Sequence, residues 1–420
     1  MELSSHLSLF LSGDIITAIH QRKPVRPWWS PPSLLMRQVG SLILLAMLTG
    51  WKKMPLWVVK YSLSLLSGAS GAQGMGCIGF PSHPVIELTS RCNLSCIHCH
   101  AGDLKDEEEL STTEVYALLD QLAMIPEFRM IAFTGGEPLL RNDLFCILRY
   151  AKNLGFSCTI ASNGTLITEQ CAQRLKDAGV AIMAISIDAT DAKTHDKIRG
   201  KNGALKEALE GISRIKKVGI PLHINVTIAS YNADQVTALM HTADKLQAAI
   251  LIMYQLVPVG RGRKIADSSL DTEANQRLIE QMCLGQAEVT VVTEPVAGPQ
   301  YWAYLMKRAG IISGPLLSLA NYFFHGCSAG RGFVYIKPNG EVLPCPFLPI
   351  SCGNIKDTPF DQIYRNSPVL NALRNRDNLT GSCGSCRYKS LCGGCRGRSY
   401  AITGDFLAED PACFLRNEAT

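Results

Sequence analysis

The sequence of 420 residues predicts an α/β protein. Its main domain is a partial (β/α)6 TIM-like barrel, between a helical N-terminal extension and a cysteine-rich C-terminal domain. From Val85 onward, short β-branched runs end in Gly, Ser or Asn and lead into amphipathic helices, which is typical of parallel βαβ units. Six such units follow one another, fewer than the eight of a closed barrel. Cysteines in CxxC pairs after residue 380 indicate a metal-binding domain at the C-terminus.

Local signals bound each predicted unit. Ser111 and Glu114 form a predicted capping box at the start of the first helix, and Gly155, Gly179 and Gly219 end the next three. The predicted strands are Val85–Leu88, Met130–Phe133, Ser157–Ala161, Ala181–Ile187, Leu222–Ile228 and Ala249–Val257. The first predicted helix begins at Ser111, and the others are Asp143–Leu154, Thr168–Ala178, Ala204–Lys217, Ala233–Lys245 and Thr272–Cys283.

The chain is long enough for two or three domains with a large core. We expect residues 1–80 to form a basic, apolar helical extension and residues 81–290 to form the partial barrel. Residues 291–326 are expected to form a linker with a helical segment, and residues 327–420 the cysteine-rich domain.

The net charge of +5 lies in the N-terminal extension. Residues 1–80 carry seven basic and two acidic side chains, while the other 340 residues carry 34 of each. The main body therefore has no basic footprint for nucleic acid. The apolar run 39–48 is too short for a bilayer, which needs about 20 residues. Tryptophans and lysines beside it suit a helix in the membrane interface, and a helical cap packed on the barrel suits it equally. A true membrane span is the less favoured third interpretation.

Sixteen cysteines are too many for incidental use in a core, and their clustering does not resemble a secreted disulfide framework. The apolar run lies far from the N-terminus and no small-residue cleavage site stands near the start, so we expect a cytoplasmic protein with metal-bound thiolates. Ten cysteines fall in the motifs described below. The other six are expected to be small buried hydrophobic residues: Cys77, Cys146, Cys158, Cys171, Cys283 and Cys352.

The segment RCNLSCIHCH at residues 91–100 carries the central motif. Cys92, Cys96 and Cys99 have a C-x3-C-x2-C spacing that lets three thiolates converge on one metal centre. Thiolates select iron–sulfur clusters, zinc or Cu(I), and an ordinary structural site takes four protein ligands. Three ligands without an evident fourth leave a metal position open for chemistry. Reduced buried cysteines or a zinc knuckle are the alternatives.

Polar motifs follow five of the predicted strands. The three cysteines follow the first strand, TGGEP (134–138) the second, SNG (162–164) the third, SID (186–188) the fourth and VPVGRGR (257–263) the sixth. Parallel strands of this kind bind ligands at their carboxyl ends. The motifs therefore predict one site at that edge of the sheet.

These motifs resemble those of the radical S-adenosylmethionine (SAM) enzymes. The resemblance implies that Cys92, Cys96 and Cys99 hold a [4Fe-4S] cluster and that SAM chelates the fourth iron through its amino and carboxylate groups. Reduction of SAM then yields a 5′-deoxyadenosyl radical, which abstracts a hydrogen atom from substrate. The cofactor supplies this chemistry, and the protein positions it and excludes water. Many relatives have Tyr after the third cysteine, where this chain has His100.

The resemblance also implies which residues contact SAM. In TGGEP, the paired glycines allow a close backbone approach and Glu137 is expected to receive the amino group. His98 is expected near the adenine, and Arg199 at the carboxylate. The full set of implied contacts is His98, Gly135, Gly136, Glu137, Ser162, Asn163, Ser186, Asp188, Arg199 and Asn225. We expect His195, His223 and His241 to be structural.

The C-terminal cysteines resemble the SPASM extension of radical SAM proteins, which carries auxiliary [4Fe-4S] clusters. A hairpin with its turn at residues 338–340 is predicted between the first two of these cysteines. The resemblance implies one cluster on Cys383, Cys386, Cys392 and Cys413, and three ligands of another on Cys327, Cys345 and Cys395. Its fourth ligand is open among Cys352, His325, solvent and substrate, so the chain carries one or two auxiliary clusters. A zinc ribbon is the alternative.

The tail sequence resembles the anaerobic haem-forming group and the maturases of tungsten enzymes. The resemblance implies an oxidoreductase that modifies a tetrapyrrole by oxidative decarboxylation or side-chain removal. Arg261 and Arg263 are candidates to receive substrate carboxylates. The expected partners are a small-molecule substrate, an electron donor such as ferredoxin or flavodoxin, no nucleic acid, and a membrane surface at residues 1–80. The alternatives are a maturase acting on a peptide, protein or metal cofactor, a membrane-associated hydrophobic substrate, and a non-catalytic zinc-binding protein.

Overall fold

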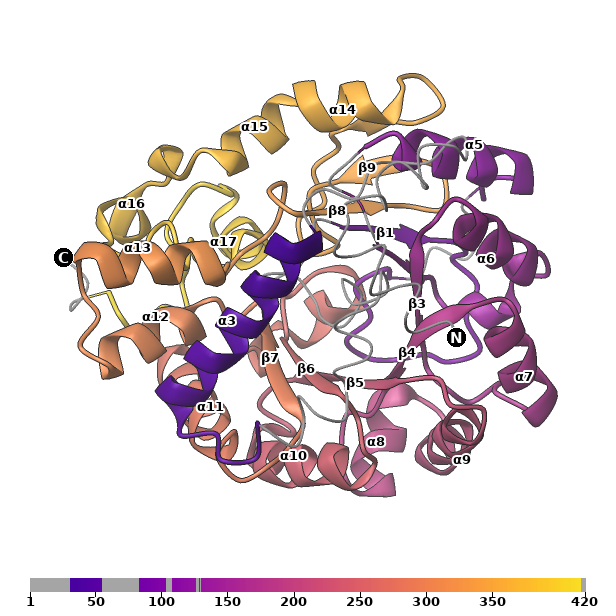
Figure 1. The fold of residues 1–420 in the computed structure, drawn as a ribbon, viewed down its shortest axis with the longest axis horizontal. Helices are drawn as coiled ribbons and strands as arrows, with labels where there is room; N and C mark the ends of the chain where they lie inside the picture. The colour runs from indigo at the N-terminus through magenta and orange to yellow at the C-terminus, as the bar shows by residue number, and fades with distance from the viewer. Residues whose placement is uncertain (1–30, 55–82, 103–107, 126–127, 129, 417–420) are drawn as a thin grey trace.

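The computed structural model describes residues 31–54, 83–102, 108–125, 128 and 130–416. In this part of the chain ten strands form one sheet in the order β10-β9-β8-β1-β2-β3-β4-β5-β6-β7. Every neighbouring pair from β8 through β1 to β7 is parallel. The sheet curls into a partial barrel with helices along its outside (Figure 1). The predicted α/β fold class with a parallel barrel sheet is confirmed.

The elements have the following bounds. The strands are β1 His83–Glu87, β2 Met130–Thr134, β3 Ser157–Ser162, β4 Val180–Ser186, β5 Leu222–Ile228, β6 Ile250–Gln255, β7 Val292–Val296, β8 Phe333–Ile336, β9 Glu341–Leu343 and β10 Gly353–Asn354. The α-helices are α3 Pro31–Thr49, α5 Thr112–Ala123, α6 Leu144–Asn153, α7 Glu169–Asp177, α8 Ala192–Arg199, α9 Ala204–Lys217, α10 Val236–Lys245, α11 Thr272–Gly285, α12 Gln300–Arg308, α13 Gly314–Phe323, α14 Phe360–Asn366, α15 Pro368–Arg374, α16 Gly381–Ser385 and α17 Arg396–Thr403. The 3-10 helices are η2 Pro138–Leu140, η3 Ala233–Gln235, η4 Gly260–Ser268 and η5 Arg376–Asn378.

The predicted barrel elements agree closely with these bounds. β5 and α9 begin and end at the predicted residues, and the other strands differ by one or two residues. The capping box is confirmed, because the Ser111 N–H donates to Glu114 Oε2 at 2.7 Å and the Glu114 N–H donates to Ser111 Oγ at 3.3 Å. In α9, the buried residues Leu205, Ala208, Ile212 and Ile215 recur at helical spacing and face the sheet.

In the described residues, four strands extend the sheet beyond the six predicted barrel strands: β7 at one edge, and β8, β9 and β10 at the other. β7 lies at one edge and pairs in parallel with β6, within the segment expected to be a linker. β8 and β9 form the hairpin predicted around residues 338–340, which is confirmed. β8 also pairs in parallel with β1, with His83 opposite Phe333. The start of the barrel and the C-terminal region are therefore joined by one continuous ladder.

The described part of the N-terminal extension packs on the protein. α3 lies across α12 and α13 (Figure 1) and buries Leu42 and Leu45. A side chain at Gly40 would clash with the Phe323 ring of α13. Trp51 is 3% exposed and donates its Nε1–H to the Val289 carbonyl at 2.8 Å. Residues 40–54 thus fit the cap interpretation, while residues 1–30 and 55–80 lie outside the described residues.

No helix in the described ranges is long and apolar enough to cross a bilayer. The expectation that six cysteines are small buried residues holds for Cys158 and Cys283. It is wrong for Cys146, which is exposed, because its position on α6 faces away from the buried stripe of that helix. Cys171 and Cys352 are half-buried, and Cys77 is outside the described residues.

Candidate functional site

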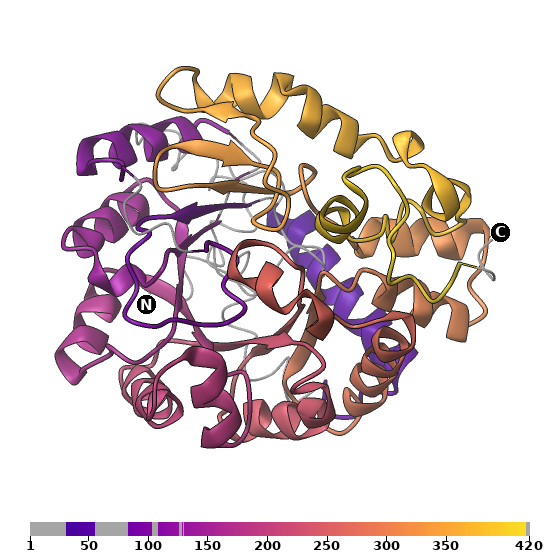
Figure 2. The ribbon, with the colours of Figure 1, turned by 180° about the vertical axis from the view of Figure 1, so that it is seen from behind.

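The loop that follows β1 carries Cys92, Cys96 and Cys99 to the wall of one large cavity. The loop has almost no regular structure of its own, so neighbouring segments must fix its shape. Figure 2 shows it beside η4 at the near end of the barrel. Three segments contact its backbone: the end of β2, the end of α8 and the start of η4.

The segment after β2 holds the start of the loop. The Gly136 N–H donates to the Thr89 carbonyl at 2.7 Å, and the Glu137 N–H donates to the Arg91 carbonyl at 2.8 Å. A side chain at Gly136 would clash with the Arg91 carbonyl, and one at Gly135 would meet that of Thr89. The paired glycines are therefore required here because two backbones approach closely.

α8 and η4 hold the rest of the loop. The Ser95 and Ile97 N–H groups donate to the carbonyls of Arg199 and Ile198, at 3.2 and 3.0 Å. The Arg261 N–H donates to the Cys99 carbonyl at 2.9 Å, and its side-chain Nε–H donates to the Cys96 carbonyl at 2.9 Å. These bonds fix the carbonyls on both sides of the Cys96 to Cys99 turn.

Asp188 organises the polar groups beside the loop. Its fully buried carboxylate accepts from Arg199 at 2.7 Å, from His98 Nε2 at 2.9 Å and from the Thr227 N–H at 2.8 Å. Burial alone would raise the pKa of Asp188, but the Arg199 guanidinium and His98 hold it well below its usual range. Asp188 therefore stays ionised and directs Arg199 and His98 toward the cavity. Arg199 also lies 3.7 Å from the Cys96 sulfur.

The residues around the loop fit a cluster and a bound nucleotide. Three thiols on one cavity wall suit a cluster that leaves one corner for a different ligand. Several buried polar atoms beside them have no hydrogen-bond partner among the described residues: His98 Nδ1, Arg199 Nε, Asn225 Oδ1 and Ser90 Oγ. Such atoms are rare in folded proteins and suit a polar ligand that pairs with them.

Glu137 does not line this cavity. Its buried carboxylate accepts from Ser162 Oγ at 2.9 Å, from the Asn163 N–H at 2.8 Å and from the Leu139 N–H at 3.2 Å. It therefore ties the end of β2 to the end of β3. Burial raises the pKa of Glu137 to about 7, although these hydrogen bonds act in the opposite direction.

The same cavity reaches a second group of cysteines. Cys327, Cys345 and Cys395 line its wall on the side of the C-terminal region. Burial raises the pKa of the Cys345 thiol, and the nearby Cys327 and Cys395 thiols raise it further. Cys352 instead lies near Ser367 and Arg374. The three thiols are therefore neighbours of one another and of the cavity.

The remaining four cysteines form a separate group away from the cavity. Burial raises the pKa of Cys392, and the thiols of Cys413, Cys383 and Cys386 add to this rise because they lie close to it. This group and the Cys327/Cys345/Cys395 group are joined by a backbone hydrogen bond, in which the Cys327 N–H donates to the Cys392 carbonyl at 2.9 Å. Within the residues that the structure describes, no three His, Cys, Asp or Glu side chains lie close enough to share one metal ion.

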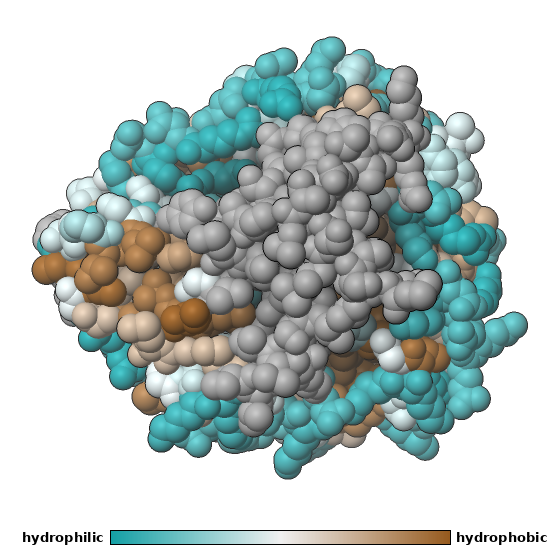
Figure 3. Space-filling view, in the orientation of Figure 1, coloured by the Kyte–Doolittle hydropathy of each residue, from teal (hydrophilic) through white to brown (hydrophobic). Residues whose placement is uncertain are grey.

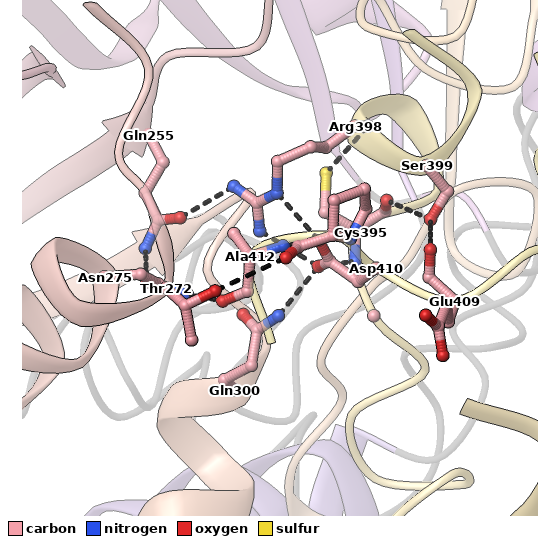
Figure 4. A network of polar contacts seen from close by, with 12 residues as sticks. Gln255, Thr272, Asn275, Gln300, Cys395, Arg398, Ser399, Glu409, Asp410 and Ala412 are labelled. Atoms are coloured by element: carbon pink, nitrogen blue, oxygen red, sulfur yellow. Dashed lines mark hydrogen bonds and ion pairs between the residues drawn. The ribbon is translucent and has the colours of Figure 1, made fainter. Parts of the chain in front are cut away.

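A buried polar network joins the C-terminal region to the barrel (Figure 4). The Arg398 Nε–H donates to Asp410 Oδ1 at 2.8 Å and its NH1 donates to Gln255 Oε1 at 2.8 Å. Asp410 also accepts from the Cys395 N–H and from Gln300 Nε2, both at 2.7 Å. Burial would raise the pKa of Asp410, but Arg398 outweighs it and lowers the pKa to about 2. The network links the Cys395 backbone to the end of β6.

The structure brings most of the predicted site residues to one cavity. The predicted site residues that line this cavity are Cys92, Cys96, Cys99, His98, Gly135, Gly136, Ser162, Asn163, Ser186, Arg199, Asn225, Arg261, Cys327, Cys345 and Cys395. Glu137, Asp188 and Arg263 are not among them, and Arg263 is exposed. Cys383, Cys386, Cys392 and Cys413 also lie elsewhere, as the separate group described above.

Sequence reasoning missed several polar residues of the cavity, among them His223 and Gln255. His223, expected to be structural, lines the cavity from β5. Gln255 lines it from the end of β6 and belongs to the network of Figure 4. For His223 the signal was present, because His223, Asn225 and Thr227 alternate with apolar residues in LHINVTI and must share one face of the strand.

Comparisons with known proteins agree with this geometry. A model of the radical SAM superfamily matches residues 86–243, and a model of the SPASM iron-sulfur cluster-binding domain matches residues 327–387. The AdoMet-dependent heme synthase of Methanosarcina barkeri (strain Fusaro / DSM 804) is 35% identical over 336 residues, which cover 79% of this chain and 95% of that protein. The Fe-coproporphyrin III synthase of the same organism is 32% identical, over 80% of this chain and 88% of that protein.

Among solved structures, Streptococcus suis SuiB bound to its precursor peptide SuiA matches with a TM-score of 0.64. It is 18% identical, and the match covers 86% of this chain and 79% of SuiB. At this level of identity the likeness concerns the fold.

Three thiols on the loop after the first barrel strand, with further thiol groups behind the same cavity, define an iron–sulfur enzyme of the barrel type. The chain belongs to the radical SAM superfamily and carries a C-terminal SPASM domain. It uses a [4Fe-4S] cluster and SAM as cofactors, as this family does. The expectation of an enzyme is confirmed, and the alternative of a non-catalytic zinc-binding protein is set aside.

Glu137 makes the stability of the cofactor-free protein depend on pH. Its folded pKa of about 7 exceeds the unfolded value of 4.5, so the folded state binds the proton more tightly and stability falls as pH rises between these values. We expect the free energy of unfolding to drop by on the order of 2–3 kcal/mol more in wild type than in E137Q between pH 4.5 and 8. Urea unfolding at several pH values measures this difference, and parallel curves would contradict it.

The network of Figure 4 should behave as a unit. Replacing one partner of a buried ion pair leaves the other charge uncompensated, so R398M and D410N should each lower stability by about 3–5 kcal/mol. The double variant should lose clearly less than the sum. Urea unfolding of the four proteins gives the coupling, with R387M as the control because Arg387 is exposed in the same region. Additive effects would contradict a coupled network.

Proposed function

We propose that this enzyme modifies a tetrapyrrole in haem-type biosynthesis, by oxidative decarboxylation or removal of a side chain. The observation that carries the proposal is that one cavity reaches both the Cys92/Cys96/Cys99 thiols and the Cys327/Cys345/Cys395 thiols. A substrate in this cavity would lie between the two groups. The two relatives above, named as heme and Fe-coproporphyrin III synthases, support this substrate class.

Cys92, Cys96 and Cys99 would hold the cluster that SAM completes. When bound, the cluster and SAM supply a 5′-deoxyadenosyl radical that abstracts hydrogen from substrate. Gly135, Gly136 and the polar residues at the ends of β3, β4 and β5 would hold SAM, the proposed contacts being Ser162, Asn163, Ser186, Asn225, His98 and Arg199. In this proposal Glu137 and Asp188 act through the residues that they position.

The C-terminal cysteines would hold auxiliary [4Fe-4S] clusters, which accept the electron that net oxidation releases. Cys327, Cys345 and Cys395 would provide three ligands beside the cavity, with a fourth position open. Cys383, Cys386, Cys392 and Cys413 would provide a complete set behind it. The backbone hydrogen bond from Cys327 to Cys392 holds the two sets of cysteines next to each other.

The cavity suits an anionic substrate beside SAM. Residues of the barrel strands and of the C-terminal region line it together, so it extends from one group of thiols to the other. Arg261 lines the cavity and brings positive charge for a carboxylate. Arg263 is exposed outside it and is a weaker candidate.

A peptide substrate is the second candidate, because SuiB, which shares the fold, is bound to a peptide. The lower identity of SuiB makes the tetrapyrrole the leading proposal. Oxygen-free incubation of the reconstituted enzyme with SAM, dithionite and each substrate class, followed by mass spectrometry, separates the two. Ferredoxin or flavodoxin is the proposed physiological electron donor, and either should replace dithionite in this assay.

Substitutions in the two cysteine groups that line the cavity should impair different steps of the reaction. C96S should lose 5′-deoxyadenosine formation by about 100-fold or more, since it removes a ligand of the SAM-binding cluster. C395S should still form 5′-deoxyadenosine but should yield no modified tetrapyrrole. C146S is the control, because Cys146 is exposed and belongs to neither group. Persistent 5′-deoxyadenosine in C96S, or full product in C395S, would contradict these roles.

We further propose a peripheral contact between the N-terminal side of the protein and an anionic membrane. An apolar surface over α3 and α13 appears in brown in Figure 3. Its exposed members are Ile43, Met47, Ile312, Leu316 and Leu319. Exposed basic residues lie at the ends of the neighbouring elements: Lys52, Lys53, Lys307 and Arg308. Apolar side chains rimmed by positive charge suit the interface of an anionic bilayer.

Vesicle sedimentation tests this contact. The full chain should bind phosphatidylcholine vesicles that contain phosphatidylserine better than vesicles without it, and M47D/L316D should lose binding. M124D is the matched control, because Met124 is 67% exposed at the end of α5, away from this surface. Equal binding of both variants, or no binding of the wild type, would exclude this surface as a membrane contact.

A further inference from the structure

The inward face of β5 carries a polar residue that neither the family motifs nor the SAM contacts explain. His223 lines the cavity, together with Asn225 and Thr227 further along the strand. The alternate residues Leu222, Ile224 and Ile228 pack in the hydrophobic core. The pleat of the strand therefore directs the imidazole into the barrel.

The His223 side chain has no partner within the described protein. It is 1% exposed, and neither Nδ1 nor Nε2 makes a hydrogen bond. Its strand neighbours are Ala184 and Ile250, whose side chains offer no polar group. By contrast, Nδ1 of the structural His195 accepts from the Asp188 N–H at 3.1 Å. An unpaired buried polar group costs about 1–3 kcal/mol, so the lack of a partner needs an explanation.

The protonation state of the imidazole limits the kinds of ligand that His223 can bind. Burial lowers the pKa of His223 to about 3, so the ring is neutral at physiological pH and offers a lone pair in place of a positive charge. A neutral imidazole is a poor counter-ion for a carboxylate but a common metal ligand, and the usual proximal ligand of haem iron. Positive charge for carboxylates lies elsewhere on the wall, at Arg199 and Arg261.

The wall near His223 also leaves room for a flat ligand. The residues facing the cavity from β2, β3 and β4 at a similar depth are small: Ala132, Thr159, Ala161 and Ala184. Thr159 Oγ1, like His223, is buried without a hydrogen-bond partner in the part of the chain that the structure describes. Small side chains on the β2 to β4 side of the cavity, with an unpaired imidazole on β5, suit a planar macrocycle that carries a metal. The other strands contribute larger residues to the wall, such as Ile252, Phe333 and Tyr335.

We propose that His223 binds the central iron of an iron-containing tetrapyrrole substrate through a ring nitrogen. This inference rests on the proposed function, because it names the metallated form of that substrate class. Ligation would anchor the macrocycle inside the barrel between the two cavity-lining thiol groups. His223 is then a substrate-binding residue that discriminates iron-loaded from metal-free macrocycles.

Oxygen-free titration with ferric coproporphyrin III tests the inference, using the reconstituted full chain without SAM or reductant. Wild type should change the absorption and EPR spectra of the iron macrocycle to those of a nitrogen-ligated species. H223Q should lose this change and bind about tenfold or more weakly. Metal-free coproporphyrin III should bind wild type and H223Q equally, which also shows that the variant is folded. H241Q, which alters an exposed histidine on α10, should behave as wild type.

The outcomes separate this inference from the proposed function. If the iron macrocycle binds wild type but keeps its unligated spectrum, or if H223Q retains the ligated spectrum, the inference is overturned and the tetrapyrrole proposal stands. If neither macrocycle binds wild type, both are overturned. Should H223Q not fold, H223N replaces it in the titration, and wild type grown with 15N-histidine adds a second measurement. No ENDOR coupling of the label to the substrate iron overturns the inference, and coupling in wild type that H223N lacks supports it.

Discussion

The loop after β1 depends on its neighbours for its shape, and the rest of the site depends on this loop. Backbone hydrogen bonds from the segments after β2, at the end of α8 and at the start of η4 fix it along its whole length. Gly136 permits one of these approaches and Gly200, at φ +68°, permits another against Ser95. Three thiols held in this way can meet one cluster without a fourth residue of the chain.

Near each group of cysteines that lines the cavity, a buried carboxylate forms an ion pair with a buried arginine. Asp188 pairs with Arg199 beside Cys96, and Asp410 pairs with Arg398 beside Cys395. Each carboxylate also accepts backbone N–H groups, so its charge is compensated on several sides. Such pairs contribute little net stability but impose one arrangement, because any displacement would leave a buried charge unpaired. The pairs therefore act chiefly as positioning devices for the neighbouring thiols.

Much of the fold could be predicted from local sequence. β5 and α9 follow from period-two alternation and helical spacing within single segments. β7 was not predicted because Pro295 interrupts its pattern, and such a strand is tolerated here because it lies at the sheet edge. The parallel pairing of β8 with β1 joins segments far apart in the chain, which local patterns cannot reveal.

The candidate site, like the fold, could be predicted only in part from the sequence. Motif spacing identified the three thiols and most of the residues that share their cavity. It did not reveal that Glu137 turns toward the end of β3, since the direction of a side chain depends on the donors that surround it in space. Nor did it distinguish His223 from a satisfied core histidine, because the difference lies in the partners that the neighbouring strands fail to provide.

The most direct test of the account is ENDOR spectroscopy of the reduced enzyme with SAM that carries 15N at the amino group and 17O at the carboxylate. An iron corner left open by Cys92, Cys96 and Cys99 predicts hyperfine coupling of both labels to the cluster. Coupling of neither label, in a sample that contains the reduced cluster and bound SAM, would show that the corner is closed and would contradict the account.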